Sequence, residues 1–208
     1  MIEVKEVSCR LKNRVILDQI SLHLQAKKCY GFVGHNGCGK TMLFRVIAGL
    51  LRYTDGEVLI DGKKIGHDID FIGDCGTIIG EITFINHLSG YDNLLILAQI
   101  RQKISSKEIE EAFAKVGLSH AMHEKYKNYS LGMKQRLRIA QAIMEDPKVL
   151  ILDEPFNGLD KQGTKEIQDL LLTYKKRGKT ILLTSHDERD IERLCDEVFE
   201  MSQGRLQN

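Results

Sequence analysis

The sequence predicts an α/β fold whose core is interrupted by a mostly helical lobe. Short apolar runs typical of buried parallel strands occur at Cys29–Val33 and Val149–Leu152. Between them, the apolar residues take on helical spacing, and a helix also follows the first run. The 208 residues are enough for one large domain with an inserted lobe. We therefore expect a single domain, 1–208, in which the core comprises 1–80 and 147–208 and the helical lobe comprises 81–146.

The first part of the chain is predicted to hold strands and one helix. Residues 21–25 alternate apolar and polar side chains, which indicates a half-exposed strand. A helix is expected after the run Cys29–Val33, because apolar residues recur there at helical spacing, namely Leu43, Val46, Ile47 and Leu50. Residues 57–60 end at Asp61-Gly62 and indicate another strand followed by a turn.

The later part of the chain becomes helical from about Asp92 and then returns to strands. One helix is marked by apolar positions from 109 to 116 and ends at Gly117. A second covers 133–144 and ends before Pro147. The strand Val149–Leu152 follows, then a helix around 167–174 and a further strand at Thr180–Thr184.

Composition limits the function classes. The formal net charge is +1 with interspersed acids and bases, so nothing indicates a nucleic-acid partner. The longest apolar stretches fall well short of the roughly 20 residues that cross a bilayer, and the N-terminus lacks the apolar segment of a signal peptide. A membrane process would therefore need a separate membrane chain. Five scattered cysteines without a Cys-x-x-Cys pair predict a reducing cytosol and no disulfide partners.

A glycine-rich loop lies between the predicted strand and helix, and it consists of Gly34, His35, Asn36, Gly37, Cys38, Gly39, Lys40 and Thr41. Its glycines allow backbone N–H groups to approach a phosphate closely, and the following helix N-terminus favours anions. We expect Lys40 to face solvent and reach the β and γ phosphates, while the Thr41 hydroxyl ligates Mg²⁺. A glycine turn that precedes Lys-Thr by chance is the alternative, but the strand before and helix after favour nucleotide binding.

Two carboxylates follow the second buried strand. Asp153 would lie at the carboxyl end of a parallel strand, where α/β sheets bind ligands, and could hold Mg²⁺. Glu154 is available as a general base for an attacking water. A strand ended by solvated acids is the alternative; behind a phosphate-binding loop, the catalytic interpretation is favoured.

At this point the sequence resembles the ATP-binding subunits of ABC transporters over almost its whole length. The motifs in chain order are the phosphate loop, Tyr129-Ser130-Leu131-Gly132-Met133, the Asp153-Glu154 strand, Gly158-Leu159-Asp160 and His186 after a strand. The second of these stands at the place of the family signature and departs from its common Leu-Ser-Gly-Gly-Gln form at three of five positions. The run from Tyr129 to Leu137 is nevertheless similar to that of bacitracin- and lantibiotic-type exporter ATPases.

The resemblance implies a P-loop NTPase core of the RecA-like type, with an antiparallel β subdomain and an inserted helical subdomain. It implies that two ATPase subunits, identical or different, pair head to tail around ATP and Mg²⁺. Ser130, Leu131, Gly132, Met133 and Asp160 would then face the partner's site, while Glu154 and His186 would act on the γ-phosphate. A separate polytopic membrane subunit would hold the protein at the cytoplasmic face of the membrane.

Three positions depart from the family pattern. Leu11 stands where an aromatic residue usually stacks on adenine, and Met42 stands where a small hydroxyl residue is common. Gly80 stands where a glutamine or glutamate usually touches the metal site, and Glu81 follows it. We therefore treat Leu11 as a base contact and Glu81 as a replacement metal contact only as hypotheses; for Glu81 the alternative is a solvated loop residue.

Other members of the same ATPase superfamily are less compatible with this chain. Translation-associated proteins carry two such cassettes, and chromosome-maintenance ATPases split theirs with a long coiled coil; the sequence shows neither feature. A cassette that serves a soluble assembly or regulatory complex remains the alternative to transport. The transported substrate and the direction of transport are not written in this chain, because they would depend on the membrane subunit.

Overall fold

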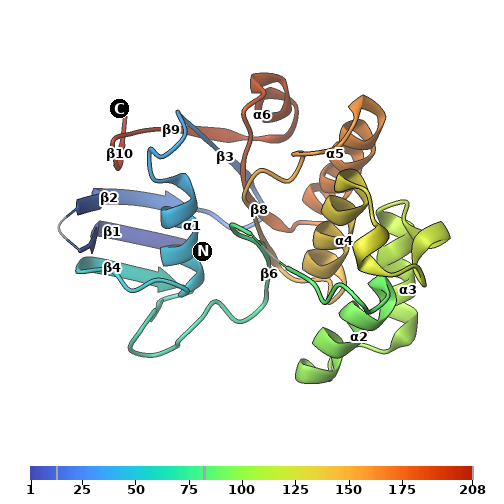
Figure 1. Cartoon of the computed structure of the whole chain (residues 1–208). Coiled ribbons are helices and arrows are strands. Elements are labelled where there is room, and N and C mark those ends of the chain that lie inside the picture. Colours follow the sequence, from blue (N-terminus) through green and yellow to red (C-terminus); the bar gives the residue numbers. More distant parts are fainter. Residues whose placement is uncertain (13, 82, 208) are drawn as a thin grey trace.

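The computed structural model describes residues 1–12, 14–81 and 83–207. Two sheets lie side by side with helix α1 between them, and further helices cover the outer face of the second sheet (Figure 1). The first sheet is antiparallel and has the strand order β2 (Arg14–Leu24), β1 (Ile2–Leu11), β4 (Asp55–Ile60) and β5 (Lys63–Lys64).

The second sheet forms the centre of the molecule and is mostly parallel. Its strand order is β10 (Arg205–Leu206), β9 (Glu197–Ser202), β3 (Cys29–Val33), β8 (Thr180–Thr184), β7 (Val149–Leu152) and β6 (Cys75–Ile78). Neighbouring strands from β9 to β6 run parallel, and β10 pairs antiparallel with β9. Since β8 lies between β3 and β7, the loops after these three strands meet at one edge of the sheet.

The helices are α1 (Lys40–Ala48), α2 (Gly90–Arg101), α3 (Ser106–Lys115), α4 (Leu131–Ile143), α5 (Lys161–Lys176) and α6 (Glu188–Leu194), with short 3₁₀ turns at Ser119–Ala121 and Tyr126–Asn128. Helices α2 to α4 follow one another in the region predicted to be helical. Ser89 and Ser105 begin α2 and α3 with capping boxes, in which serine and the acid three residues later satisfy free N–H groups. Among the described residues, no helix is both long and apolar enough to span a membrane.

Alternation along the central strands divides the core into two halves. Ile151 and Leu182 face the antiparallel sheet and α1, whereas Leu150 and Leu183 face the outer helices. All four side chains are fully buried. Each contributes about 1.5–3 kcal/mol relative to an exposed position, so a sheet buried on both faces is the rigid element that holds the loops at its edge.

Helix α1 confirms the predicted helix but ends earlier than its apolar spacing suggested. Gly49 adopts a left-handed conformation with φ 82° and ends the helix, and its N–H donates to the carbonyl oxygens of Arg45 and Val46. Leu50 therefore lies beyond the helix and is 56% exposed. The strands predicted around 21–25 and 57–60 are present as parts of the longer strands β2 and β4.

Candidate functional site

The glycine-rich loop connects β3 with α1 and adopts a backbone that side chains would hinder. Gly34 has φ 140° and Gly39 has φ 117°, both in the left-handed range. A β-carbon at Gly34 would collide with the backbone oxygen of Met201 and would lie 2.9 Å from the Cys38 sulfur. The loop therefore folds tightly against β9, with His35, Asn36 and Gly37 exposed at its tip and Cys38 buried beneath it.

Lys40 begins α1 and is buried, contrary to the expectation that it faces solvent. Its ammonium donates to the carbonyl oxygens of Gly34 at 2.6 Å and His35 at 3.3 Å, so the loop wraps around the cation. Within the described residues no side chain caps α1, and its first turn carries no acid. The first-turn N–H groups and Lys40 together form a cationic cradle suited to phosphate.

Thr41, Asp153 and Thr184 form a hydrogen-bonded chain across three elements. The Thr41 hydroxyl donates to Asp153 Oδ2 at 2.6 Å, and the Thr184 hydroxyl donates to Asp153 Oδ1 at 2.9 Å. The Glu154 N–H in turn donates to the Thr184 oxygen at 2.8 Å. Thr184 is the last residue of β8, which lies between β3 and β7, so its hydroxyl holds both the Asp153 side chain and the Glu154 backbone. Sequence reasoning did not select this residue. Its one signal was a polar residue at the end of an apolar strand, two positions before His186.

Glu154 and His186 face each other at the edge of the sheet. Glu154 Oε1 lies 3.2 Å from His186 Nε2, which is an ion pair when the imidazole is protonated, and this buried oxygen accepts no hydrogen bond among the described residues. Burial raises the pKa of Glu154, and the Asp153 carboxylate adds to this, while His186 and Lys40 lower it. A partly desolvated carboxylate with a raised pKa is suited to accept a proton.

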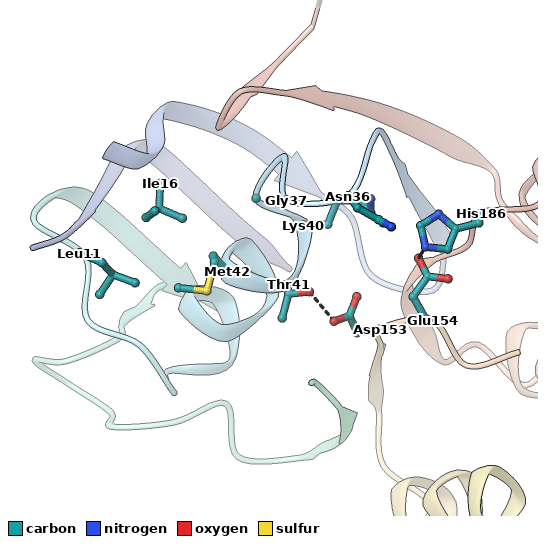
Figure 2. A pocket seen from close by; sticks show the side chains of 11 residues that line it. Leu11, Ile16, Asn36, Gly37, Lys40, Thr41, Met42, Asp153, Glu154 and His186 are labelled. Atoms are coloured by element: carbon teal, nitrogen blue, oxygen red, sulfur yellow. Dashed lines mark hydrogen bonds and ion pairs between the residues drawn. The ribbon is translucent and has the colours of Figure 1, made fainter. Parts of the chain in front are cut away.

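These residues line one pocket of about 380 Å³ (Figure 2). Leu11, Ile16 and Met42 lie together at one end, and Thr41, Asp153, Glu154 and His186 lie toward the other; Asn36, Gly37, Gly39 and Lys40 complete the lining. The pocket therefore joins an apolar end to an end rich in polar and charged groups. Such a division fits a ligand that has a flat apolar base and a charged phosphate tail.

The predicted signature residues lie outside this pocket. Ser130 caps α4, and its hydroxyl accepts the Met133 N–H at 3.2 Å. Ser130 and Leu131 are exposed, whereas Gly132 and Met133 are half-buried. Asp160 is also exposed and caps α5, where it accepts the Gly163 N–H at 2.7 Å.

The signature and the segment before Asp160 nevertheless meet on the surface. The Leu131 side chain lies over Gly158, so that a β-carbon there would be 2.6 Å from Leu131 Cγ, and a β-carbon at Gly132 would be 3.2 Å from the Gly158 oxygen. Gln135, one turn further along α4, donates to the carbonyl oxygens of Pro155 at 2.9 Å and Glu154 at 3.3 Å. Sequence reasoning missed Gln135, which ties the signature helix to the chain after the catalytic candidate.

Gly80 and Glu81 lie just past β6, close to Asp153, whose N–H bonds the Ile78 carbonyl oxygen at 2.7 Å. Gly80 has φ 68°, and a β-carbon there would lie 2.7 Å from Arg45 Nη2. Arg45 of α1 thus occupies the space that a side chain at position 80 would need. Glu81 is exposed and does not line the pocket, so its metal contact stays a hypothesis.

Comparison with known proteins decides the family. A protein-family profile described as ABC transporter matches residues 17–157. An uncharacterized ABC transporter ATP-binding protein, YybJ of Bacillus subtilis (strain 168), is 42% identical over 207 residues, covering 100% of this chain and 95% of the relative. This chain is an ATP-binding protein of the ABC transporter family. This ABC protein accordingly has ATPase activity and a role in transport, and the alternative of a soluble assembly complex is not supported.

Further relatives of this ABC protein are described as bacitracin and lantibiotic transport proteins. The bacitracin transport ATP-binding protein BcrA of Enterococcus faecalis is 38% identical, covering 99% of this chain and 68% of the relative. The lantibiotic transport ATP-binding protein SrtF of Streptococcus pyogenes is 33% identical, covering 99% and 89%. A dimeric, post-hydrolysis structure of the cassette MJ0796 has a TM-score of 0.90 at 21% identity, covering 100% of this chain and 97% of that one, which confirms the predicted fold.

The apolar end of the pocket allows a direct test of base binding by this ABC protein. We expect Leu11→Tyr to bind ATP more tightly, by about 5- to 150-fold, because stacking on a base contributes about 1–3 kcal/mol. The unchanged protein should discriminate weakly between ATP and GTP, since leucine packs on any base. Titration with both nucleotides measures these affinities.

Val15→Tyr is the matched control for that substitution. Val15 is 49% exposed, close to the 41% of Leu11, but does not line the pocket. Its replacement should leave both affinities unchanged. If Leu11→Tyr binds ATP no better than Val15→Tyr does, the base is held elsewhere and the assignment of Leu11 is wrong.

Proposed function

We propose that this ABC protein drives an exporter of antibiotics, peptides or similar compounds through a separate polytopic membrane subunit. Bacitracin and lantibiotic transport by the relatives BcrA and SrtF supports the exporter type. The single observation that carries the ATPase mechanism is the polar end of the pocket, where Lys40, Thr41, Asp153, Glu154 and His186 converge from the start of α1 and from the loops after β7 and β8.

The loop from Gly34 to Thr41 is proposed to bind the phosphates. Its backbone N–H groups and the Lys40 ammonium neutralise the β and γ phosphates at the start of α1. The base of the nucleotide would lie against Leu11, Ile16 and Met42. We propose the same subdivision of the single domain as before, with a nucleotide-binding core at 1–80 and 147–208 and a helical subdomain at 81–146.

Thr41 and Asp153 are the proposed holders of Mg²⁺. Their oxygens lie 2.6 Å apart, and a hydroxyl with a carboxylate is a donor set that Mg²⁺ prefers. Among the described residues no cluster of three or more His, Cys, Asp or Glu is placed to hold a metal ion. When bound there, Mg²⁺ would neutralise charge on the β and γ phosphates.

Glu154 is the proposed general base. Its side chain is 19% exposed and lines the pocket, so it can accept a proton from the water that attacks the γ-phosphate. His186, whose side chain is half exposed beside Glu154, would contact the γ-phosphate from the other side. Thr184 holds Asp153 and the Glu154 backbone in this arrangement.

We further propose a head-to-tail dimer with a second ATPase subunit, identical or different. The surface formed by Ser130, Leu131 and Asp160 is exposed and lies outside the chain's own pocket. The N-terminus of α4 could therefore face the γ-phosphate of a partner, where Ser130 and the helix N–H groups favour anions. The dimeric state of the MJ0796 cassette supports this arrangement.

The proposed location is the cytoplasmic face of the membrane, reached through the membrane subunit. Affinity purification from detergent-solubilised cells should therefore recover a polytopic membrane protein with this chain. The reconstituted pair should hydrolyse ATP faster when its transported compound is added. Recovery of soluble partners alone, in a preparation that retains other membrane complexes, would contradict the proposal.

Position 81 provides a test of how the metal site is completed. If Glu81 reaches the metal site in the closed state, Glu81→Ala should lower ATPase turnover several-fold and raise the Mg²⁺ requirement, with little change in nucleotide affinity. Turnover across a Mg²⁺ titration, with the membrane partner present, measures both effects.

The matched control is Glu110→Ala, which removes an exposed carboxylate from α3, away from the pocket. It should leave turnover and the Mg²⁺ requirement unchanged. If Glu81→Ala behaves like this control, this chain lacks the metal-site contact that a glutamine or glutamate at position 80 usually makes in the family. The second ATPase subunit would then be expected to retain that contact.

A further inference from the structure

Two cysteines far apart in the sequence meet at the start of β3. The Cys29 S–H group donates to Cys195 Sγ across 3.7 Å, although 166 positions separate the two residues. Cys29 is 1% exposed, and Cys195 is half-buried at the end of α6. A β-carbon at Gly31 would lie 2.9 Å from the Cys195 sulfur, so the bare glycine provides the space that this thiol occupies.

The backbone around the two thiols is fastened on both sides. The Asp196 N–H donates to the Cys29 carbonyl oxygen at 2.7 Å, and the Cys29 N–H donates to Asp196 Oδ2 at 2.9 Å. Lys175 of α5 bonds the Leu194 carbonyl oxygen at 2.8 Å and lies 2.7 Å from Asp196 Oδ1. Leu194 and Asp196, the residues on either side of Cys195, are therefore fixed by hydrogen bonds and an ion pair. These contacts keep the two thiols next to each other in the folded chain.

We propose that Cys29 and Cys195 form a peroxide-sensitive thiol pair that closes into a disulfide and slows ATP hydrolysis. Reversible disulfides in a reducing compartment are typically redox-sensing ones. The sulfur atoms would need to approach from 3.7 Å to about 2.05 Å for the bond to form. No other part of the proposed ATPase mechanism uses these residues.

The two thiols take different roles because their surroundings differ. The hydrogen bond to Cys195 and burial raise the pKa of Cys29, so this thiol stays protonated and resolves the intermediate. The sulfur of Cys195, the more accessible of the two, attacks a peroxide oxygen; the O–O bond breaks, and the products are a sulfenic acid and water, which takes up the Cys195 proton. The Cys29 sulfur then attacks the Cys195 sulfur; the S–S bond forms, the S–O bond breaks, and hydroxide leaves as water with the Cys29 proton. Overall, two thiols and one peroxide give one disulfide and two waters.

The crosslink would join two segments that lead into the site. Strand β3 runs from Cys29 directly into the phosphate-binding loop, and α6 follows the turn that carries His186. Fastening the end of α6 to the start of β3 would restrict movement of that turn relative to the loop. Because such loop movements often limit turnover, we expect slower hydrolysis of ATP rather than weaker binding.

The test is limited oxidation of the reduced full-length protein with hydrogen peroxide. Titratable thiols should fall from five to three, because two are consumed, and the intact mass should fall by about 2 Da. Peptide mapping should identify a Cys29–Cys195 link. ATP turnover should fall several-fold and recover with dithiothreitol.

Variants separate this pair from the other thiols. Cys195→Ala should keep its turnover under peroxide and form no intramolecular link, whereas Cys75→Ser, which removes another half-buried cysteine, should respond like the unchanged protein. The link in the unchanged protein is measured without any variant, so poor folding of one variant does not decide the result. Links between other cysteines, or Cys195 oxidised to a sulfinic acid with Cys29 still free, would overturn the proposal. A Cys29–Cys195 link that leaves turnover unchanged would overturn its regulatory part.

Discussion

Lys40→Ala should weaken Mg·ATP binding by at least about a hundredfold, because Lys40 is proposed to bond both the β and γ phosphates and each lost hydrogen bond from a charged donor costs about 1.5–3 kcal/mol. Lys40 lies in the pocket, and its ammonium is surrounded by the loop that is proposed to bind the phosphates. The substitution removes the one side-chain cation of that loop. Titration with a fluorescent nucleotide measures the change.

The structure also sharpens the control for this experiment. Lys40 is buried and bonds the Gly34 and His35 carbonyl oxygens, so its loss could loosen the loop as well as remove a charge. Lys40→Met keeps most of the side-chain volume and should lose binding equally. Thermal unfolding of both variants should show a folded chain. Unchanged affinity in a folded Lys40→Ala protein would remove Lys40 from the phosphate site.

Glu154→Gln should retain ATP binding and lose hydrolysis by about 10²- to 10⁴-fold, the usual contribution of a general base. Glutamine keeps the shape of the side chain beside His186 but cannot accept the proton. We expect hydrolysis to reopen the dimer, because the two subunits are proposed to pair around intact ATP, so this variant should accumulate as an ATP-bound dimer. Steady-state phosphate release and light scattering at saturating Mg·ATP measure the two effects.

Glu166→Gln is the matched control, because Glu166 is an exposed glutamate of α5 outside the pocket. It should hydrolyse ATP at the normal rate. Normal hydrolysis by Glu154→Gln would exclude Glu154 as the base. A monomer at saturating Mg·ATP would exclude the homodimer and direct the search to a second, different ATPase subunit.

The pH dependence of hydrolysis gives an independent check on Glu154. Burial raises its pKa above the ordinary value for glutamate, and the base must be deprotonated to act. As pH falls, the active form should therefore be lost at a higher pH than for an exposed glutamate. Single-turnover rates across the acidic range should show this limb in the unchanged protein. An acid limb at or below about pH 4.3, the ordinary glutamate value, would contradict the raised pKa.

Local patterns alone pointed to the central residues of the candidate site. The phosphate loop and the Asp153-Glu154 pair are each read from a few consecutive residues that follow a buried strand, and residues of both line the same pocket. Strand β1 was not predicted, because its apolar and polar residues do not alternate regularly. The structure shows the irregularity as register shifts in the pairing of β1 with β2 and as a left-handed φ of 50° at Glu6. The short strand β6 contains a glycine and carries little periodic signal.

The contacts that sequence reasoning missed depend on strand order. Thr184 reaches Asp153 only because β8 lies between β3 and β7, and no local pattern states that order. Ile16 joins Leu11 in the pocket because β1 and β2 pair side by side. The approach of Cys29 to Cys195 likewise requires β3 to pair with β9, the strand that follows α6.

The hydrogen bonds of Gln135 have a consequence for cooperativity. Gln135 belongs to the helix that begins at Ser130, and it holds the carbonyl oxygens of Glu154 and Pro155. In a head-to-tail pair, the nucleotide bound to one subunit would contact Ser130 of its partner. A movement of Ser130 would displace α4 of that partner and, through Gln135, the segment that carries the partner's own Glu154. The two sites would then hydrolyse ATP cooperatively. The Hill coefficient for hydrolysis should therefore exceed one in the unchanged protein and fall toward one in Gln135→Leu.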